Sequence, residues 1–128
     1  IKLGTDRDEA IVRAVRAEAP HAILRVDANA AWTPKRALAI IPLLAELGVE
    51  FVEQPLPAHD LEGTRFVRER SALPIVVDES CLVATDVAKV AGVADGVNLK
   101  LAKCGSLREA MRIVHAARAH DMLVMAGC

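Results

Sequence analysis

Residues 22–55, AILRVDANAAWTPKRALAIIPLLAELGVEFVEQP, contain the pattern strand, helix, strand in uninterrupted succession. The helical middle is marked at both ends, because Thr33 suits an N-cap, Pro34 a first turn and Gly48 a C-terminal stop. Pro42 lies inside this helix, where proline removes a backbone hydrogen bond, so we expect a kink or a weakened helix there. The two flanking apolar runs predict strands.

The same alternation continues outward from this stretch to both ends of the chain. Further strands are expected within IKLG (1–4), PIVVDES (74–80), DGVNLKLAK (95–103) and DMLVMAG (121–127), and further helices near 6–19, 60–71, 84–91 and 106–119. The strands are short apolar runs without strict alternation, which is typical of a parallel sheet covered on both faces. The repeat of about 25 residues is the size of a compact βα unit.

Six strands alternating with five helices fit either part of a (β/α)₈ barrel or a doubly wound sheet. The sequence lacks both a G-x-G-x-x-G motif and a P-loop, which disfavours the nucleotide-binding alternative. A full barrel needs roughly 250 residues, and this chain has 128. We therefore predict an α/β fold, a partial TIM barrel covering about strands 2–7. Because both ends are apolar, residues 1–128 are expected to be one catalytic barrel-domain fragment of a longer chain.

The composition limits the function classes. Apolar residues make up 53% of the chain and charged residues 26%, with a formal net charge of -1 and no basic stretch, so nucleic acid and anionic membranes are not expected as partners. The apolar runs are too short to span a bilayer. Three cysteines without a C-x-x-C pair argue against a disulfide framework or a zinc site and fit a cytoplasmic protein with reduced thiols.

Three successive predicted strands end in a carboxylate, namely Asp27, Glu53 and Asp78. In a barrel the carboxyl ends of the strands share the face where active sites lie. Three converging carboxylates would repel one another unless a cation lay between them, and hard oxygen ligands suit Mg²⁺. The alternative is that each acid is simply a helix cap or loop residue.

Lys100 occurs in the next strand, NLKLAK, at the place where the earlier strands carry acids, and Lys2 lies in the first. A lysine shielded from water beside a divalent cation has a lowered pKa and can act as a general base. The alternative for Lys100 is a structural ion pair or a side chain that extends to solvent. Lys103 could contact the site, but it follows Lys100 at the point where the chain is expected to turn outward, so it is left unassigned. Trp32 is expected to pack against neighbouring loops rather than line the pocket.

The set IKLG, RVDANAAW, FVEQPL, VVDES and NLKLAKCGS, taken in order, resembles the enolase superfamily in its muconate-lactonizing subgroup. Within that subgroup the chain is most similar to the dipeptide epimerases of the L-Ala-D/L-Glu type. The resemblance implies that Asp27, Glu53 and Asp78 bind a Mg²⁺ cofactor. It also implies that Lys2 and Lys100 are catalytic residues on opposite faces of the substrate.

The resemblance further implies that Asn29 and Cys128 lie at the substrate. The family often has K-x-G-G after the sixth strand, whereas this chain has KCGS, with Ser106 in the second glycine position. The family's capping domain and its eighth strand, whose D-x-D motif recognises a dipeptide ammonium, have no counterpart in this sequence. By analogy, a homo-oligomer is expected.

The resulting functional prediction is a Mg²⁺-dependent epimerase or racemase that abstracts the proton α to a carboxylate of a small molecule, such as the dipeptide L-Ala-L-Glu, through an enediolate. Alternatives are an N-acylamino-acid racemase, an o-succinylbenzoate synthase or a muconate-type cycloisomerase. An alternative of another class is a non-catalytic barrel fragment, which would expose open sheet edges.

Overall fold

In the computed structural model, which describes residues 1–128, five parallel strands form one sheet whose spatial order, β1 to β5, is their order in the chain. The strands are β1 (Leu24–Asp27), β2 (Val49–Glu53), β3 (Ile75–Val77), β4 (Gly96–Lys100) and β5 (Leu123–Gly127). The helices are α1 (Asp8–Glu18), α2 (Pro34–Glu46), α3 (Leu61–Arg68), α4 (Ala84–Val90), α5 (Leu101–Cys104) and α6 (Leu107–Ala119).

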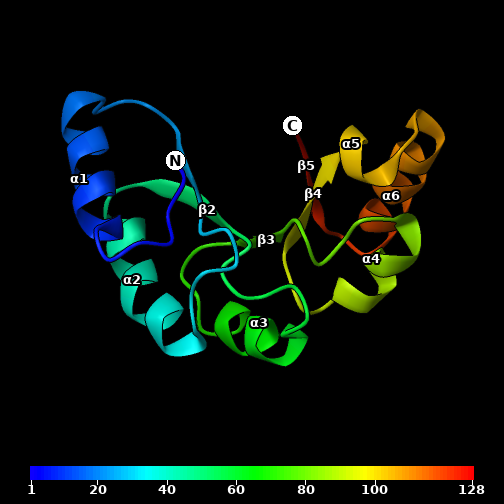
Figure 1. The fold of residues 1–128 in the computed structure, drawn as a ribbon, viewed down its shortest axis with the longest axis horizontal. Helices are drawn as coiled ribbons and strands as arrows, with labels where there is room; N and C mark the ends of the chain where they lie inside the picture. Colours follow the sequence, from blue (N-terminus) through cyan, green and yellow to red (C-terminus); the bar gives the residue numbers. More distant parts are fainter.

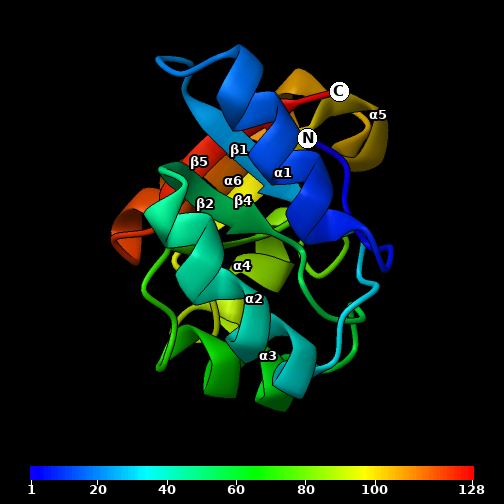
Figure 2. The same ribbon diagram turned by 90° about the vertical axis from the view of Figure 1, so that its left-hand side faces the viewer.

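The curved sheet forms a half-barrel. Figure 1 shows α1, α2, α3, α4 and α6 following one another along an arc, with the strands inside it. Turned by 90°, α1 and α2 lie over β1 and β2 (Figure 2). Sequential parallel order with helices on the outer side is the arrangement of a (β/α)₈ barrel, so the predicted fold class is confirmed.

The predicted first strand, at residues 1–4, is wrong as a strand. This segment forms only an isolated bridge between Lys2 and Asp27. Leu3 N–H donates to the Asp27 carbonyl at 2.7 Å, and Asp27 N–H donates to the Ile1 carbonyl at 2.9 Å. The pairing ends at Gly4, whose φ of 109° turns the chain away and whose absent Cβ would lie 2.8 Å from the Ala31 Cβ. The bridge still brings Lys2 beside the end of β1.

The helices follow the predicted pattern with small changes at their ends. Thr33 caps α2, since its hydroxyl accepts a hydrogen bond from the Arg36 N–H at 3.3 Å. Pro42 does not end this helix, because it lies on the exposed face, where the carbonyl that it leaves without an N–H partner can reach water. The longest helices have 13 residues, and none is long and apolar enough to cross a bilayer.

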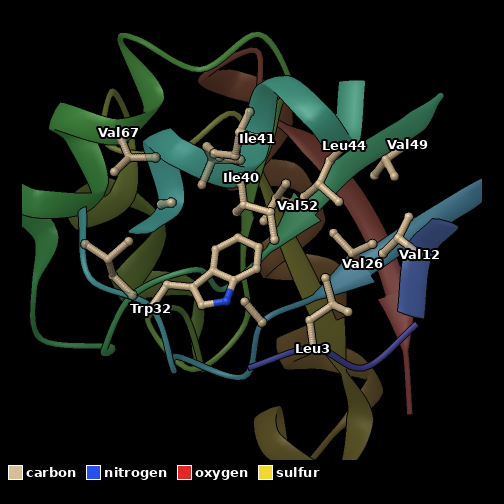
Figure 3. Packing of buried hydrophobic residues seen from close by; sticks show 14 of the residues in the cluster. Leu3, Val12, Val26, Trp32, Ile40, Ile41, Leu44, Val49, Val52 and Val67 are labelled. Atoms are coloured by element: carbon tan, nitrogen blue, oxygen red, sulfur yellow. The ribbon is translucent and has the colours of Figure 1, made fainter. Parts of the chain in front are cut away.

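The main core lies between the sheet and helices α1 to α3. Trp32 is buried in this core among Ile40, Val52 and Leu3 (Figure 3). Its indole N–H donates to the Asp8 carboxylate at 2.8 Å, which satisfies the polar end of the ring. Trp32 therefore packs against neighbouring elements, as predicted. A second cluster lies between the far end of the sheet and helices α4 and α6.

Candidate active site

The three predicted acids lie at one edge of the sheet. Asp27 and Glu53 are register partners at the ends of β1 and β2, and Asp78 directly follows β3. Neighbouring strands are about 4.8 Å apart, so these ends are close in space. The three residues are deeply buried, with 7%, 7% and 1% of their surfaces exposed. Burial at the carboxyl ends of parallel strands identifies this edge as the candidate site.

The nearest polar partner differs from one carboxylate to the next. The Lys2 ammonium pairs with Asp27. Glu53 accepts a hydrogen bond from the Asn98 side-chain amide at 2.6 Å. Lys100 Nζ lies 2.7 Å from Asp78 Oδ2 and 3.9 Å from Glu53 Oε1. Lys2 and Lys100 thus approach the row of acids from its two ends.

Lys103, which the sequence left unassigned, is a member of the site. Its ammonium lies 2.7 Å from Asp78 Oδ1 and 3.4 Å from Glu79 Oε1. The short helix α5 begins directly after Lys100 and carries Lys103 back over the end of β3. Because Lys100 ends β4 and Lys103 lies in the single turn of α5, no periodic pattern in the sequence indicates that both lysines meet at Asp78.

Asn98 is a residue of the site that the sequence analysis missed. It precedes Lys100 by two positions on β4, so both side chains point to the same face of the sheet. Its Nδ2 faces Glu53, while its buried Oδ1 has no hydrogen-bond partner. On the neighbouring strand β5, a Cβ atom at Gly127 would lie only 2.5 Å from that oxygen. Alternation along the strand is the feature that could have indicated Asn98.

The ionisation of these groups is strongly coupled to their partners. The hydrogen bond to Asp27 raises the pKa of Lys2, and the hydrogen bond to Asp78 raises the pKa of Lys100. The lowered pKa predicted for a lysine beside a divalent cation stays a prediction, since the direction seen here is set by the carboxylates that the two ammoniums face. Burial raises the pKa of Glu53. Burial acts in the same direction on Asp78, but the two lysines outweigh it and lower the pKa of that carboxyl.

The geometry contains no group of three acidic, imidazole or thiol side chains gathered closely enough to enclose a metal ion. The chemistry of the donor set nevertheless fits Mg²⁺, because all three acids offer hard oxygen ligands at one buried edge. Burial is the main cause of the raised pKa of Glu53, and the neighbouring Asp27 and Asp78 act in the same direction, so a cation at this edge would stabilise its ionised form. Asp27, Glu53 and Asp78 are therefore the residues that could hold the ion.

A cavity of about 210 Å³ opens on this edge. Its lining includes Lys2, Asp27, Glu53, Asn98, Lys100, Gly127 and Cys128. Asn29 lies beside it, with its Oδ1 3.3 Å from Lys2 Nζ and its backbone N–H donating to Asp27 Oδ1 at 2.8 Å. The predicted substrate residues Asn29 and Cys128 are thus near the two lysines.

Comparisons with family models and with known proteins agree on one family. A family model described as enolase C-terminal domain-like matches residues 1–128. An L-Ala-D/L-amino acid epimerase from Maribacter sp. (strain HTCC2170) is 47% identical over all of this chain, which covers 38% of that protein. A hydrophobic dipeptide epimerase from Roseobacter litoralis is 44% identical over all of this chain, which covers 39% of that protein.

Solved structures agree with this result. The dipeptide epimerase from Enterococcus faecalis V583, complexed with Mg and the dipeptide L-Leu-L-Tyr, matches with a TM-score of 0.94 and 39% identity, over 100% of this chain and 37% of that one. The chain thus spans between a third and two fifths of the length of these relatives. Because the family model covers every residue, this chain belongs to the enolase C-terminal domain-like family, in the enolase superfamily.

Proposed function

We propose that the protein is a Mg²⁺-dependent epimerase that inverts the carbon α to the carboxylate of a dipeptide. The observation that carries this proposal is the placement of Lys2 and Lys100. The two lysines line one cavity and contact opposite ends of the row of acids. A substrate carbon between them can lose a proton to one lysine and receive a proton from the other on the opposite face.

The acids and the lysines have different roles in this proposal: the acids would bind the metal ion, and the lysines transfer protons. An α-proton next to a carboxylate is very weakly acidic, and its removal leaves an enediolate with a second negative charge. When bound by Asp27, Glu53 and Asp78, Mg²⁺ would stabilise that charge as a Lewis acid. Lys2 and Lys100 each alternate between ammonium and amine, so the cationic partner of each step also stabilises the developing anion.

The choice of a dipeptide rests on the relatives. The Roseobacter litoralis and Enterococcus faecalis proteins are both named dipeptide epimerases, and the latter holds a dipeptide with Mg. In this chain Asn29 and Cys128 lie near Lys2 and at the cavity, respectively, where they would contact the bound dipeptide. The whole activity is proposed for the full-length natural protein.

The test is isotope exchange. The full-length protein is incubated with L-Ala-L-Glu and Mg²⁺ in D₂O, and the glutamate α-proton is followed by NMR. We expect exchange with inversion in the wild type and its loss in Lys2→Ala and Lys100→Ala. Glu9→Ala, at an exposed helix position, serves as the control and should keep the wild-type rate.

Two results would contradict the proposal in different ways. Inversion that survives in either lysine variant would rule out the two-base mechanism. Absence of exchange in a wild-type protein that binds Mg²⁺ would rule out this dipeptide, and N-succinylated amino acids would be the next substrates to assay.

A further inference from the structure

Gln54 is a fully buried polar residue in an uncommon backbone conformation. It directly follows Glu53, none of its surface is exposed, and its φ is 34°. A non-glycine residue with positive φ is uncommon and persists where the surroundings fix it. Asn29 and Ala30, in the loop after β1, also have positive φ values, of 48° and 58°.

The side chain of Gln54 uses both ends of its amide on the loops around the acids. Its Oε1 accepts hydrogen bonds from the backbone N–H groups of Asp78, at 2.8 Å, and Ser80, at 3.3 Å. Its Nε2 donates to the Leu56 carbonyl at 2.8 Å and to the Ser80 hydroxyl at 3.0 Å. The peptide that bears the Asp78 carboxylate therefore depends on this side chain.

The backbone of Gln54 extends the connection to the other two strands. Its N–H donates to the Val76 carbonyl of β3 at 2.8 Å. Its carbonyl accepts a hydrogen bond from the Ala30 N–H at 2.8 Å, in the loop that follows Asp27. Gln54 thus contacts the regions of all three acids. It is hydrogen-bonded to the loop that follows Asp27, it directly follows Glu53, and its side chain accepts the hydrogen bond of the Asp78 N–H.

We propose that Gln54 is a positioning residue, which fixes Asp27, Glu53 and Asp78 relative to one another so that they can share one divalent cation. This inference rests on the proposed function. If Gln54 served the core alone, an apolar side chain of the same length would replace it without effect on the acids. Its hydrogen bonds instead reach the loops that carry Asp78 and follow Asp27. Substitution of a residue that supports metal ligands in this way commonly lowers metal affinity by about 10–100-fold.

The test uses Mn²⁺ as the probe, because its free ion gives an EPR spectrum and no substrate is needed. The full-length protein is titrated with Mn²⁺ as wild type and as Gln54→Met, which keeps the length of the side chain and removes the amide. We expect the dissociation constant to rise about tenfold or more in Gln54→Met. Faster deuterium exchange of the Asp78 amide, measured by NMR, should accompany this change, because that N–H loses its acceptor.

Thr64→Val is the matched control. Thr64 is fully buried and its hydroxyl donates to the Asp60 carbonyl at 2.8 Å, away from the acids. This variant should lower the melting temperature and leave Mn²⁺ affinity within twofold of the wild type. An equal loss of affinity in Thr64→Val and Gln54→Met would overturn the inference, since general destabilisation would then explain both.

Ser80→Ala covers the case in which Gln54→Met does not fold. It removes one partner of the Gln54 amide and leaves Asp78 its acceptor, so Mn²⁺ binding should weaken about threefold, less than the range for losing a whole supporting residue. Unchanged Mn²⁺ affinity in every folded variant would overturn the positioning role of Gln54 and leave the proposed function standing. A wild-type protein that binds neither Mn²⁺ nor Mg²⁺ would overturn the proposed function together with this inference.

Discussion

At the scale of single residues, Asn98 and Gly127 depend on each other. The Asn98 amide donates to Glu53, and Gly127 on the neighbouring strand leaves room for the Asn98 side chain because it has no Cβ atom. In Gly127→Ala the new Cβ would lie 2.5 Å from Asn98 Oδ1, so one of the two must move. We expect this variant to lose about 1–3 kcal/mol of unfolding free energy, as overpacked sites do. Urea unfolding followed by circular dichroism measures the loss.

A double-mutant cycle isolates the cause of that loss. Asn98→Ala removes the oxygen that the new methyl group would strike, so Gly127→Ala should cost less than half as much in the Asn98→Ala background. Additive free energies in the two variants would show that the close approach of Asn98 is not the reason for glycine at 127.

The cysteines provide a second prediction at this scale. Burial raises the pKa of the Cys81 thiol to about 11, because the thiolate is poorly solvated there. Cys128 is exposed and Cys104 partly exposed. At pH 8 a thiol reagent should therefore modify Cys128 and Cys104 and leave Cys81 unmodified, as read by intact and peptide mass spectrometry. In urea all three should react, and modification of Cys81 in the folded protein at the rate of Cys128 would contradict its placement.

At the scale of elements, Asp8 joins the start of α1 to the loop that carries Trp32. Its Oδ1 accepts from the backbone N–H groups of Gly4, at 2.9 Å, and Thr5, at 2.8 Å, while Oδ2 accepts from Trp32. Asp8→Asn replaces one acceptor by a donor, so a buried N–H loses its partner. We expect a loss of about 1–3 kcal/mol of unfolding free energy at pH 7.

The difference in unfolding free energy between wild type and Asp8→Asn should depend on pH. Burial alone would raise the pKa of Asp8, but hydrogen bonds from Thr5, Trp32 and Gly4 outweigh burial and lower it. A carboxylate with a lowered pKa in the folded state stabilises the fold fully above its unfolded pKa of about 3.9 and loses this contribution as the pH falls further. The difference between wild type and Asp8→Asn should thus be constant from pH 7 to 5 and shrink below pH 4. A constant difference down to pH 3 would contradict it.

The same scale shows what the sequence can and cannot predict. The helix α2 was predictable because Thr33, Pro34 and Gly48 act locally, through capping and backbone preference. The acids were predictable because each ends an apolar run. The helix α5 was not, since four residues give no periodic pattern. Its position decides where Lys103 points, so that contact was missed together with the helix.

The strand predicted at residues 1–4 failed for a related reason. Its apolar residues predicted a strand, but Gly4 ends the pairing after a single bridge. A β-bridge depends on how a neighbour aligns in space, which local composition does not record. Asn98 was missed although strand alternation placed it beside Lys100, because an uncharged amide gives no chemical indication of a site until its partner Glu53 is known.

At the scale of the whole molecule, the half-barrel leaves apolar surface near its last strand. Leu107 and Met111 of α6 are 73% and 51% exposed, and Leu123 and Val124 of β5 are also exposed. Leu107, Met111 and Val124 line an apolar groove at the edge of the sheet that β5 forms. Exposed apolar patches beside an unpaired strand favour association. A polypeptide of residues 1–128 should therefore self-associate and enhance the fluorescence of 1-anilinonaphthalene-8-sulfonate (ANS).

Charge placed on this surface should reverse both effects. Leu107→Lys with Met111→Lys keeps α6 helical, since lysine is a good helix former, and puts two repelling ammoniums on the groove. We expect ANS fluorescence to fall by at least half and sedimentation velocity to show a smaller species. Phe66→Lys, at a 44% exposed apolar residue on α3, is the control for the general effect of added charge. If Phe66→Lys reduced association as much as the α6 variant does, charge repulsion between whole molecules would be the cause. Association that only the α6 variant abolishes would locate the contact at the groove beside β5.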